Sequence, residues 1–193
     1  MDEEGLSAEI RRRAGHYEVL GETYAKFEFF EQGWNPYSRF LDVDKVDLVL
    51  RRRVSAEIVY RDVQVKYGKL YRIGKEWEKS FFDLTSWRFF RETEFDEYLD
   101  DERFFIAYVL SADTGYRGDI FIFPVRDFAA ILRAAIPTKG QRKVYISRLR
   151  DSPERWVLRL LNRFAALDEA SVLDVSRYRR NFESLHASVP QVR

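Results

Sequence analysis

The sequence contains no cysteine, and this absence excludes three kinds of chemistry at once. The protein can have no disulfide framework, no thiolate metal site and no cysteine nucleophile. Its only histidines, His16 and His186, lack neighbours at the spacing of a metal site. The glycine patterns of nucleotide-binding loops and of the serine nucleophile elbow are missing as well. We therefore expect neither a serine or cysteine hydrolase nor a protein with a nucleotide cofactor.

Long apolar runs are also missing. No stretch approaches the roughly 18 uncharged apolar residues that a membrane span requires. The first residues, Met1 to Glu4, are acidic, whereas a secretory signal begins with basic residues. Hydrophobic residues nevertheless make up 46% of the 193 residues, which is enough for the core of one domain. We expect a cytoplasmic protein without a membrane partner.

The net charge of +1 hides three segments of strongly biased charge. Residues 51–75 carry eight Lys/Arg and two Asp/Glu, and residues 139–163 carry the same numbers. Residues 92–102 carry seven acids and no base. Two basic segments that meet in space would attract a polyanion such as DNA. Each segment is equally typical of a solvated face of a helix or hairpin.

Hydrophobic periodicity predicts an α/β protein with mostly antiparallel strands. A helix is expected from Ser7 to Gln32, a buried strand at Val46–Leu50 and an alternating strand at Glu57–Tyr67. Further strands are expected at 104–110, 118–125 and 143–147, and further helices at 127–135 and 152–167.

On this interpretation the chain has three parts. Residues 1–14 form an N-terminal helical arm, and residues 15–137 form the α/β core. Residues 138–193 form a basic C-terminal extension of strand and helix, which packs on the core and ends in a loosely ordered tail. The extension is expected to be helical because Trp156, Leu160 and Phe164 follow helical spacing.

Four polar residues in the first third of the chain suit a metal-dependent phosphodiester site: Glu22, Asp47, Gln64 and Lys66. Gln64 and Lys66 are two apart on a strand, so their side chains share one face. Asp47 opens an apolar run, where a carboxylate is costly to bury unless it is paired or metal-bound. Carboxylate oxygens are natural Mg²⁺ ligands, and a lysine can stabilise or activate the attacking water.

At these residues the sequence resembles the PD-(D/E)XK nuclease superfamily, which has the restriction-endonuclease-like fold. The matching residues are Gly21-Glu22, Gly33-Trp34, Pro36, Asp47-Leu48-Val49-Leu50 and Val63-Gln64-Val65-Lys66-Tyr67. The last motif has the form Q-x-K and is most similar to the branch that includes a group I intron homing endonuclease. The spacing from Glu22 to Gly33-Trp34 is similar to that of archaeal Holliday-junction resolvases. The resemblance covers residues 15–75, about a third of the chain.

The resemblance implies an αβββαβ core, with a mixed sheet flanked by helices, in front of the helical C-terminal extension. It also implies that Glu22, Asp47 and the backbone carbonyl of Val65 bind Mg²⁺, or Mn²⁺ in its place, while Lys66 positions or activates water. Most of the superfamily has Asp or Glu where this chain has Gln64. The neutral amide removes one negative charge and predicts weaker metal binding.

DNA is the partner that this resemblance implies. Candidate phosphate contacts are Arg51, Arg52, Arg53, Lys69, Arg72, Lys75, Arg142 and Lys143. Duplex cutting by this fold commonly uses two sites, so a homodimer is expected. The aromatic segment Phe81–Phe90 is its candidate interface wherever its rings are exposed.

Simpler interpretations of the same residues stay open. Glu22 is also typical of a solvated helix face, with Glu18 or Glu28 able to take its role, and Asp47 of a turn. Three hypotheses on function follow. The protein is a Mg²⁺-dependent DNA endonuclease, a DNA-binding module of the same fold without catalysis, or a protein-interaction factor that uses residues 92–102 or 81–90.

Overall fold

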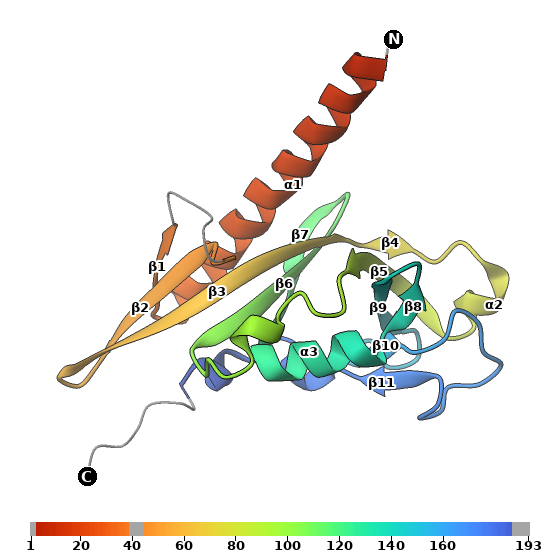
Figure 1. Cartoon of the computed structure of the whole chain (residues 1–193). Coiled ribbons are helices and arrows are strands. Elements are labelled where there is room, and N and C mark those ends of the chain that lie inside the picture. Colours follow the sequence, from red (N-terminus) through yellow and green to blue (C-terminus); the bar gives the residue numbers. More distant parts are fainter. Residues whose placement is uncertain (1–2, 39–44, 187–193) are drawn as a thin grey trace.

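The computed structural model describes residues 3–38 and 45–186, with side chains described from residue 15 onward (Figure 1). The protein is a mixed α/β protein built mostly of strands, which form two sheets. The helices are α1 (Glu3–Glu31), α2 (Glu76–Lys79) and α3 (Val125–Ala134), with 3₁₀ turns η1 (Asp96–Tyr98), η2 (Ser176–Tyr178) and η3 (Phe182–Leu185). No helix in the described ranges is long and apolar enough to cross a membrane.

The first sheet carries the N-terminal half of the chain. Its strands, in spatial order, are β1 (Asn35–Ser38), β2 (Leu48–Val54), β3 (Glu57–Lys69), β6 (Phe104–Ala112) and β7 (Gly115–Pro124). Strands β2 and β3 form an antiparallel hairpin, β3 and β6 run parallel, and β6 and β7 form a second hairpin. The first sheet is therefore a mixed sheet, as expected.

The second sheet is built from the middle and the end of the chain. It contains, in spatial order, β11 (Val172–Asp174), β10 (Trp156–Arg159), β9 (Gln141–Leu149), β5 (Phe82–Phe90) and β4 (Tyr71–Arg72), and β8 (Ile136–Thr138) pairs with β9. The connection from β3 to β6 passes through this sheet, by way of β4, α2, β5 and η1, and not through one long helix.

Two apolar layers hold the molecule together. Helix α1 packs on one face of the first sheet through Ala25 and Phe29, while the second sheet and α3 cover the other face. Strand β6 lies between the layers, and every residue from Phe104 to Ser111 is buried. Alternate side chains of this strand enter opposite layers, as the pleat of a strand buried on both faces requires.

Glycine allows two close approaches around β3. A Cβ on Gly21 would lie 3.1 Å from Cβ of Tyr67, so α1 crosses β3 closely at this point. A Cβ on Gly68 would lie 2.5 Å from Oγ of Ser86 and 2.7 Å from Leu110. Any side chain at Gly68 would therefore push apart the two sheets at the position where the chain passes from one to the other.

The expected C-terminal helical extension is wrong. Residues 156–159 form strand β10 instead, and turns follow it up to β11. The helical spacing of Trp156, Leu160 and Phe164 is misleading, because Trp156 and the three residues that follow it are all buried. A run of consecutive buried residues is typical of a strand covered on both faces. The expected loose tail falls partly on residues 187–193, which lie outside the described residues, whereas Val175 and Leu185 before them are buried.

Candidate active site at the end of strand β3

All five residues that the sequence assigns to the catalytic site line one cleft. Glu22, Asp47, Gln64, Val65 and Lys66 surround a cavity of about 270 Å³. They come from helix α1, the segment before β2, and β3, so folding is needed to bring them together. The remaining lining residues are Glu18, Tyr67 and Arg88.

The cleft lies where β2 stops covering the edge of β3. The last registered pair is Leu48 with Val63, and the amide of Asp47 donates to the carbonyl of Val63 at 3.0 Å. Beyond this pair, the amide of Val65 donates to the Asp47 carboxylate Oδ2 at 2.6 Å. The amide and carbonyl of one strand residue point to the same edge. The carbonyl of Val65 therefore points to the edge on which Asp47 lies.

The two faces of the first sheet contribute different groups to this edge. Val63 belongs to the layer under α1, so by alternation Gln64 and Lys66 face the second sheet. Glu18 and Glu22 reach the cleft from α1, and Arg88 reaches it from β5. The site thus combines carboxylates on one side, a lysine and an arginine on the other, and Asp47 between them.

Gln64 is the buried polar group that points to a ligand. Its side chain is 5% exposed and lines the cleft, and its Oε1 accepts no hydrogen bond from the part of the chain that the structure describes. A buried acceptor without a donor costs about 1–3 kcal/mol. A cation or an ordered water that reached this oxygen from the cleft would satisfy it.

Lys66 is held inside the site and not in solvent. Its side chain is 14% exposed, and its Nζ lies 3.4 Å from Oε1 of Glu94. Burial lowers the pKa of Lys66, and the nearby Arg88 lowers it further, while Glu94 and Asp47 oppose this effect. A lysine with a lowered pKa can give up its proton more readily, which suits a group that binds and activates water.

Glu94 and Arg88 are the two site residues that the sequence analysis misses. Arg88 donates to the carbonyl of Tyr67 at 2.9 Å, and Glu94 pairs with Lys66 as described above. Both lie on the connection that passes through the second sheet, whose contact with β3 no local pattern reveals. The one available signal is an arginine inside the aromatic strand 86–90.

The structure also decides between the acids of α1. Glu22 is about one-third exposed and pairs with Lys26 at 3.6 Å, and Glu18, one turn earlier, lines the same cleft. Glu28 lies elsewhere, because its Oε1 accepts hydrogen bonds from Tyr116 at 2.7 Å and from Arg180 at 2.9 Å. Of the two alternatives to Glu22, only Glu18 remains.

The donor set fits a hard divalent cation, but weakly. Among residues 15–38 and 45–186, no three His, Cys, Asp or Glu side chains converge closely enough to hold a metal ion by themselves. A cation here would depend on Asp47 and Glu22 together with neutral oxygens, namely the Val65 carbonyl and the Gln64 amide. Mg²⁺ accepts such a mixed set because it usually retains several of its waters.

Most of the candidate phosphate contacts are already engaged within the protein. Lys69 pairs with Asp113 at 2.7 Å, Arg142 with Glu92 at 2.9 Å, and Lys75 lies 4.0 Å from Glu78. Arg51 is half-buried, whereas Arg52 lies over the ring of Trp34 and contacts the Gln32 carbonyl and His186, so Arg52 helps to hold the fold. Arg53 and Arg72 are exposed, and Lys143 lies against aromatic rings.

The acidic run 92–102 is neutralised within the chain. Six of its seven acids form ion pairs: Glu92 with Arg142, Glu94 with Lys66, Asp96 with Arg133, Glu97 with Lys45, Asp100 with Arg126 and Asp101 with Arg103. All of these bases except Arg103 lie more than twenty residues from their partners in the sequence. The run therefore works as an internal connector, and this weakens its interpretation as a partner-binding surface.

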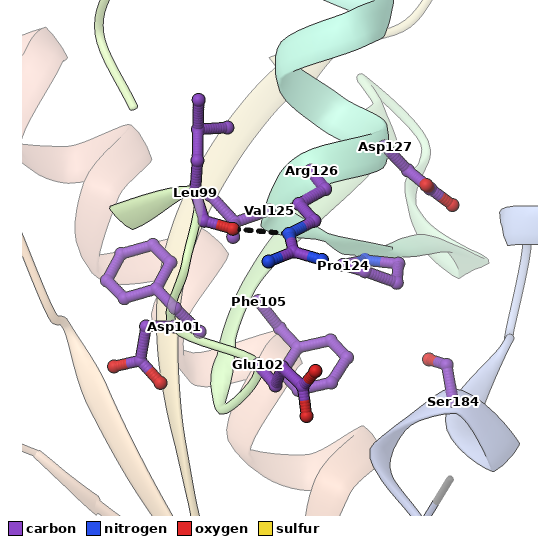
Figure 2. A pocket seen from close by; sticks show the side chains of 10 residues that line it. Leu99, Asp101, Glu102, Phe105, Pro124, Val125, Arg126, Asp127 and Ser184 are labelled. Atoms are coloured by element: carbon purple, nitrogen blue, oxygen red, sulfur yellow. Dashed lines mark hydrogen bonds between the residues drawn. The ribbon is translucent and has the colours of Figure 1, made fainter. Parts of the chain in front are cut away.

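A second hollow, of about 360 Å³, lies between the end of this acidic run and the start of α3 (Figure 2). Asp101, Glu102 and Asp127 line it, together with Arg126, whose Nε donates to the carbonyl of Leu99 at 2.6 Å. We call it the acidic hollow. None of the residues that the sequence assigns to a site lies in it.

Comparison with known proteins adds no assignment. No known protein family, no curated protein and no solved structure matches the chain at a significant level. The cleft and the sequence motifs that form it are therefore the features that indicate a function.

Proposed function

We propose that the protein is a Mg²⁺-dependent endonuclease that hydrolyses phosphodiester bonds of DNA, on a core of the restriction-endonuclease-like αβββαβ type. The observation that carries this proposal is the convergence of Glu22, Asp47, Gln64 and Lys66 in one cleft, with the Gln64 Oε1 buried and without a donor. These four residues are spread over more than forty positions, yet the fold brings them to one cleft that also contains a buried amide oxygen without a donor, and a ligand in the cleft would account for both features.

Each residue has a defined role in this proposal. Asp47 and Glu22 bind the cation together with the Val65 carbonyl, and Mn²⁺ would substitute for Mg²⁺. The bound cation would neutralise charge on the phosphate and acidify a water. The hydrogen bond from the Val65 amide fixes the Asp47 carboxylate in place at the edge of β3.

The opposite side of the cleft holds the water. Lys66 positions the attacking water and accepts its proton, because burial has lowered the pKa of this lysine. Glu94 would stabilise the ammonium that forms when the neutral Lys66 takes up this proton, and Arg88 adds a positive charge beside it for the phosphate. The exposed Arg53 and Arg72 would contact neighbouring phosphates. Two copies of the chain would be needed to cut both strands of a duplex.

The test is cleavage of supercoiled plasmid and of a branched DNA by the purified protein in Mg²⁺, in Mn²⁺ and in chelator. The variants are Asp47→Ala and Lys66→Ala, with Asp113→Ala as a matched exposed acid outside the cleft. We expect cleavage that requires metal, is lost in the first two variants and is retained in the third. Cleavage that persists in both cleft variants, each shown to be folded, would remove this site from consideration.

A second candidate is a DNA-binding module on the same fold that does not cut. Gln64 favours it, since the amide leaves the site with one negative charge fewer for the cation. The module would bind DNA with a steep dependence on salt and would leave plasmid intact in both metals. A calorimetric Mg²⁺ titration that shows no difference between the wild type and Asp47→Ala would favour this candidate.

A further inference from the structure

The outer face of the second sheet carries a group of aromatic side chains that nothing in the described structure covers. Trp87 and Phe89 on β5 are paired with Tyr145 and Lys143 on β9, and Tyr71 on β4 pairs with Thr85 of β5. Alternation places these side chains on one face. Trp87 and Tyr71 are each 42% exposed, and Phe89 is 39% exposed. We call Tyr71, Trp87, Phe89, Lys143 and Tyr145 the aromatic face.

A cation lies in the middle of the aromatic face. The Nζ of Lys143 lies 4.3 Å from the ring centroid of Tyr145, 4.7 Å from that of Trp87 and 5.5 Å from that of Phe89. It donates to the Tyr145 hydroxyl at 2.8 Å, and no described carboxylate pairs with it. Cation–π contacts hold the ammonium at the surface while its charge stays available to an anion.

Aromatic side chains are exposed on only one part of the outer side of the second sheet. Next to it, the same side of the sheet is covered, because Phe164 packs on Phe82 and α2 supplies Glu78 to the buried Arg159. A protein that covers one part of a sheet face and leaves Trp, Phe and Tyr exposed on the rest gives up burial energy there. Such a patch marks a contact surface.

We infer that the aromatic face binds single-stranded DNA, and that the substrate of the nuclease proposed above is therefore a DNA with a single-stranded arm. Stacking on aromatic rings requires bases whose faces are free, which a duplex does not offer. Phosphates require an unneutralised cation, which Lys143 supplies. A second copy of the chain is a poorer occupant, because most of the acids in its acidic run are already paired internally.

The aromatic face and the cleft share one strand. Arg88 lines the cleft, while its neighbours Trp87 and Phe89 point to the opposite side of β5. A single strand bound on the aromatic face would therefore have to pass around an edge of the second sheet to reach the cleft. This part of the inference depends on the proposed function, whereas binding itself does not.

The test is the fluorescence anisotropy of labelled oligo(dT) in chelator, so that nothing is cut. Trp87→Ala and Phe89→Ala should each raise Kd by about 10-fold, because base stacking on one ring is worth that much. Lys143→Gln should also weaken binding, and Trp87→Phe should restore most of it. Tyr37→Ala is the matched control, since Tyr37 on β1 is 47% exposed and lies outside the face.

The outcomes separate this inference from the proposed function. Asp47→Ala should bind oligo(dT) like the wild type, because it lies in the cleft. Unchanged binding by the folded double variant Trp87→Ala/Phe89→Ala would overturn the inference, and so would equal affinity for duplex and for oligo(dT), or self-association that this variant abolishes. Binding without metal-dependent cleavage would leave the inference standing and overturn only the nuclease.

Discussion

The cleft at the end of β3 and the acidic hollow beside α3 are similar in size and in their number of carboxylates. They differ in the burial of their polar groups and in how far these groups are already paired. In the cleft, Gln64 is buried without a donor and Lys66 is largely buried with a lowered pKa. In the acidic hollow, the cation Arg126 is exposed and is occupied by the Leu99 carbonyl and by Asp100. The cleft therefore has unused bonding capacity, and the acidic hollow has little.

A group of acidic side chains is therefore not enough to define a metal or catalytic site. Two of the three acids of the hollow belong to a run whose charges are compensated by Arg103, Arg126 and other bases, and the third, Asp127 on α3, lies 3.9 Å from Arg177. Those of the cleft come from α1 and the edge of β3 and lie beside Gln64, whose buried Oε1 has no donor among the described residues. Desolvation of an incompletely paired polar group has a free-energy cost that folding would avoid unless a ligand offsets it.

The largest expected effect comes from removing the lysine of the cleft without changing its shape. Lys66→Gln should lower metal-dependent cleavage by at least about 100-fold, since the water loses the group that positions it. Metal affinity should not fall, because the cation's ligands are unchanged. Single-turnover cleavage and a Mg²⁺ titration measure the two effects. Arg126→Gln in the acidic hollow is the paired control, and a comparable loss there would break the comparison.

Adding charge to the cleft should have the next largest effect. Gln64→Glu should tighten Mg²⁺ binding by about 10-fold, because the number of charged ligands sets the affinity of such sites. Calorimetric titration gives the value directly. Glu102→Gln removes a charge from the rim of the acidic hollow and should leave Mg²⁺ binding unchanged. Equal responses of the two variants would show that neither hollow binds the cation specifically.

Removing the charge of Glu94 should change the pKa of Lys66, with a smaller effect on cleavage than the two substitutions above. This glutamate raises the pKa of Lys66 against the effect of burial. In Glu94→Gln the pKa of Lys66 therefore falls further, and the limb of the cleavage profile that reports this lysine should move to lower pH. A profile of rate against pH for both proteins measures the shift. An unmoved limb would mean that Lys66 does not titrate in the rate-limiting step.

The smallest effect is expected in the acidic hollow. Burial alone would raise the pKa of Asp101, but hydrogen bonds from the side chain and backbone of Arg103 outweigh it and hold the pKa below 3.8. The ionised Asp101 thus stabilises the folded state above that pH and loses this contribution as the pH falls through its lowered pKa. Asp101→Asn should cost less than about 1 kcal/mol near neutral pH. Urea unfolding should show this difference vanish in acid, while cleavage by the variant should equal that of the wild type at each pH.

Sequence periodicity is enough to predict the parts of the fold that depend on local contacts. The long helix α1, the hairpin strands β2 and β3, strands β6 and β7 and helix α3 all lie close to their expected positions. Strand β9 of the second sheet also covers its expected residues, 143–147, but its pairing could not be predicted, because its partner β5 lies more than fifty residues away. Helical spacing around Trp156 concealed strand β10 for the same reason, since its burial comes from distant elements.

The candidate site follows the same division. Asp47, Gln64 and Lys66 belong to one hairpin, so their proximity follows from strand alternation and from the point where β2 ends. Glu94 comes from beyond the second sheet, and its contact with Lys66 exists only after the chain has passed through that sheet. Glu22 was predicted from the resemblance to the nuclease motifs, and it lies one turn of α1 from Glu18, the second acid of the helix that lines the cleft.

Gly68 lies in the short segment of chain that connects the cleft with the second sheet, and its surroundings make this segment rigid. The chain from Lys66 in the cleft to Tyr71 on the aromatic face is nearly continuous extended strand, and it spans roughly 16 Å at the usual rise per residue. No slack can develop at the crossing, because Ser86 and Leu110 leave room only for a glycine there. If DNA occupies both the cleft and the aromatic face, this rigid crossing would keep the two surfaces at a constant separation. The distance between the two surfaces would then be the same for every substrate.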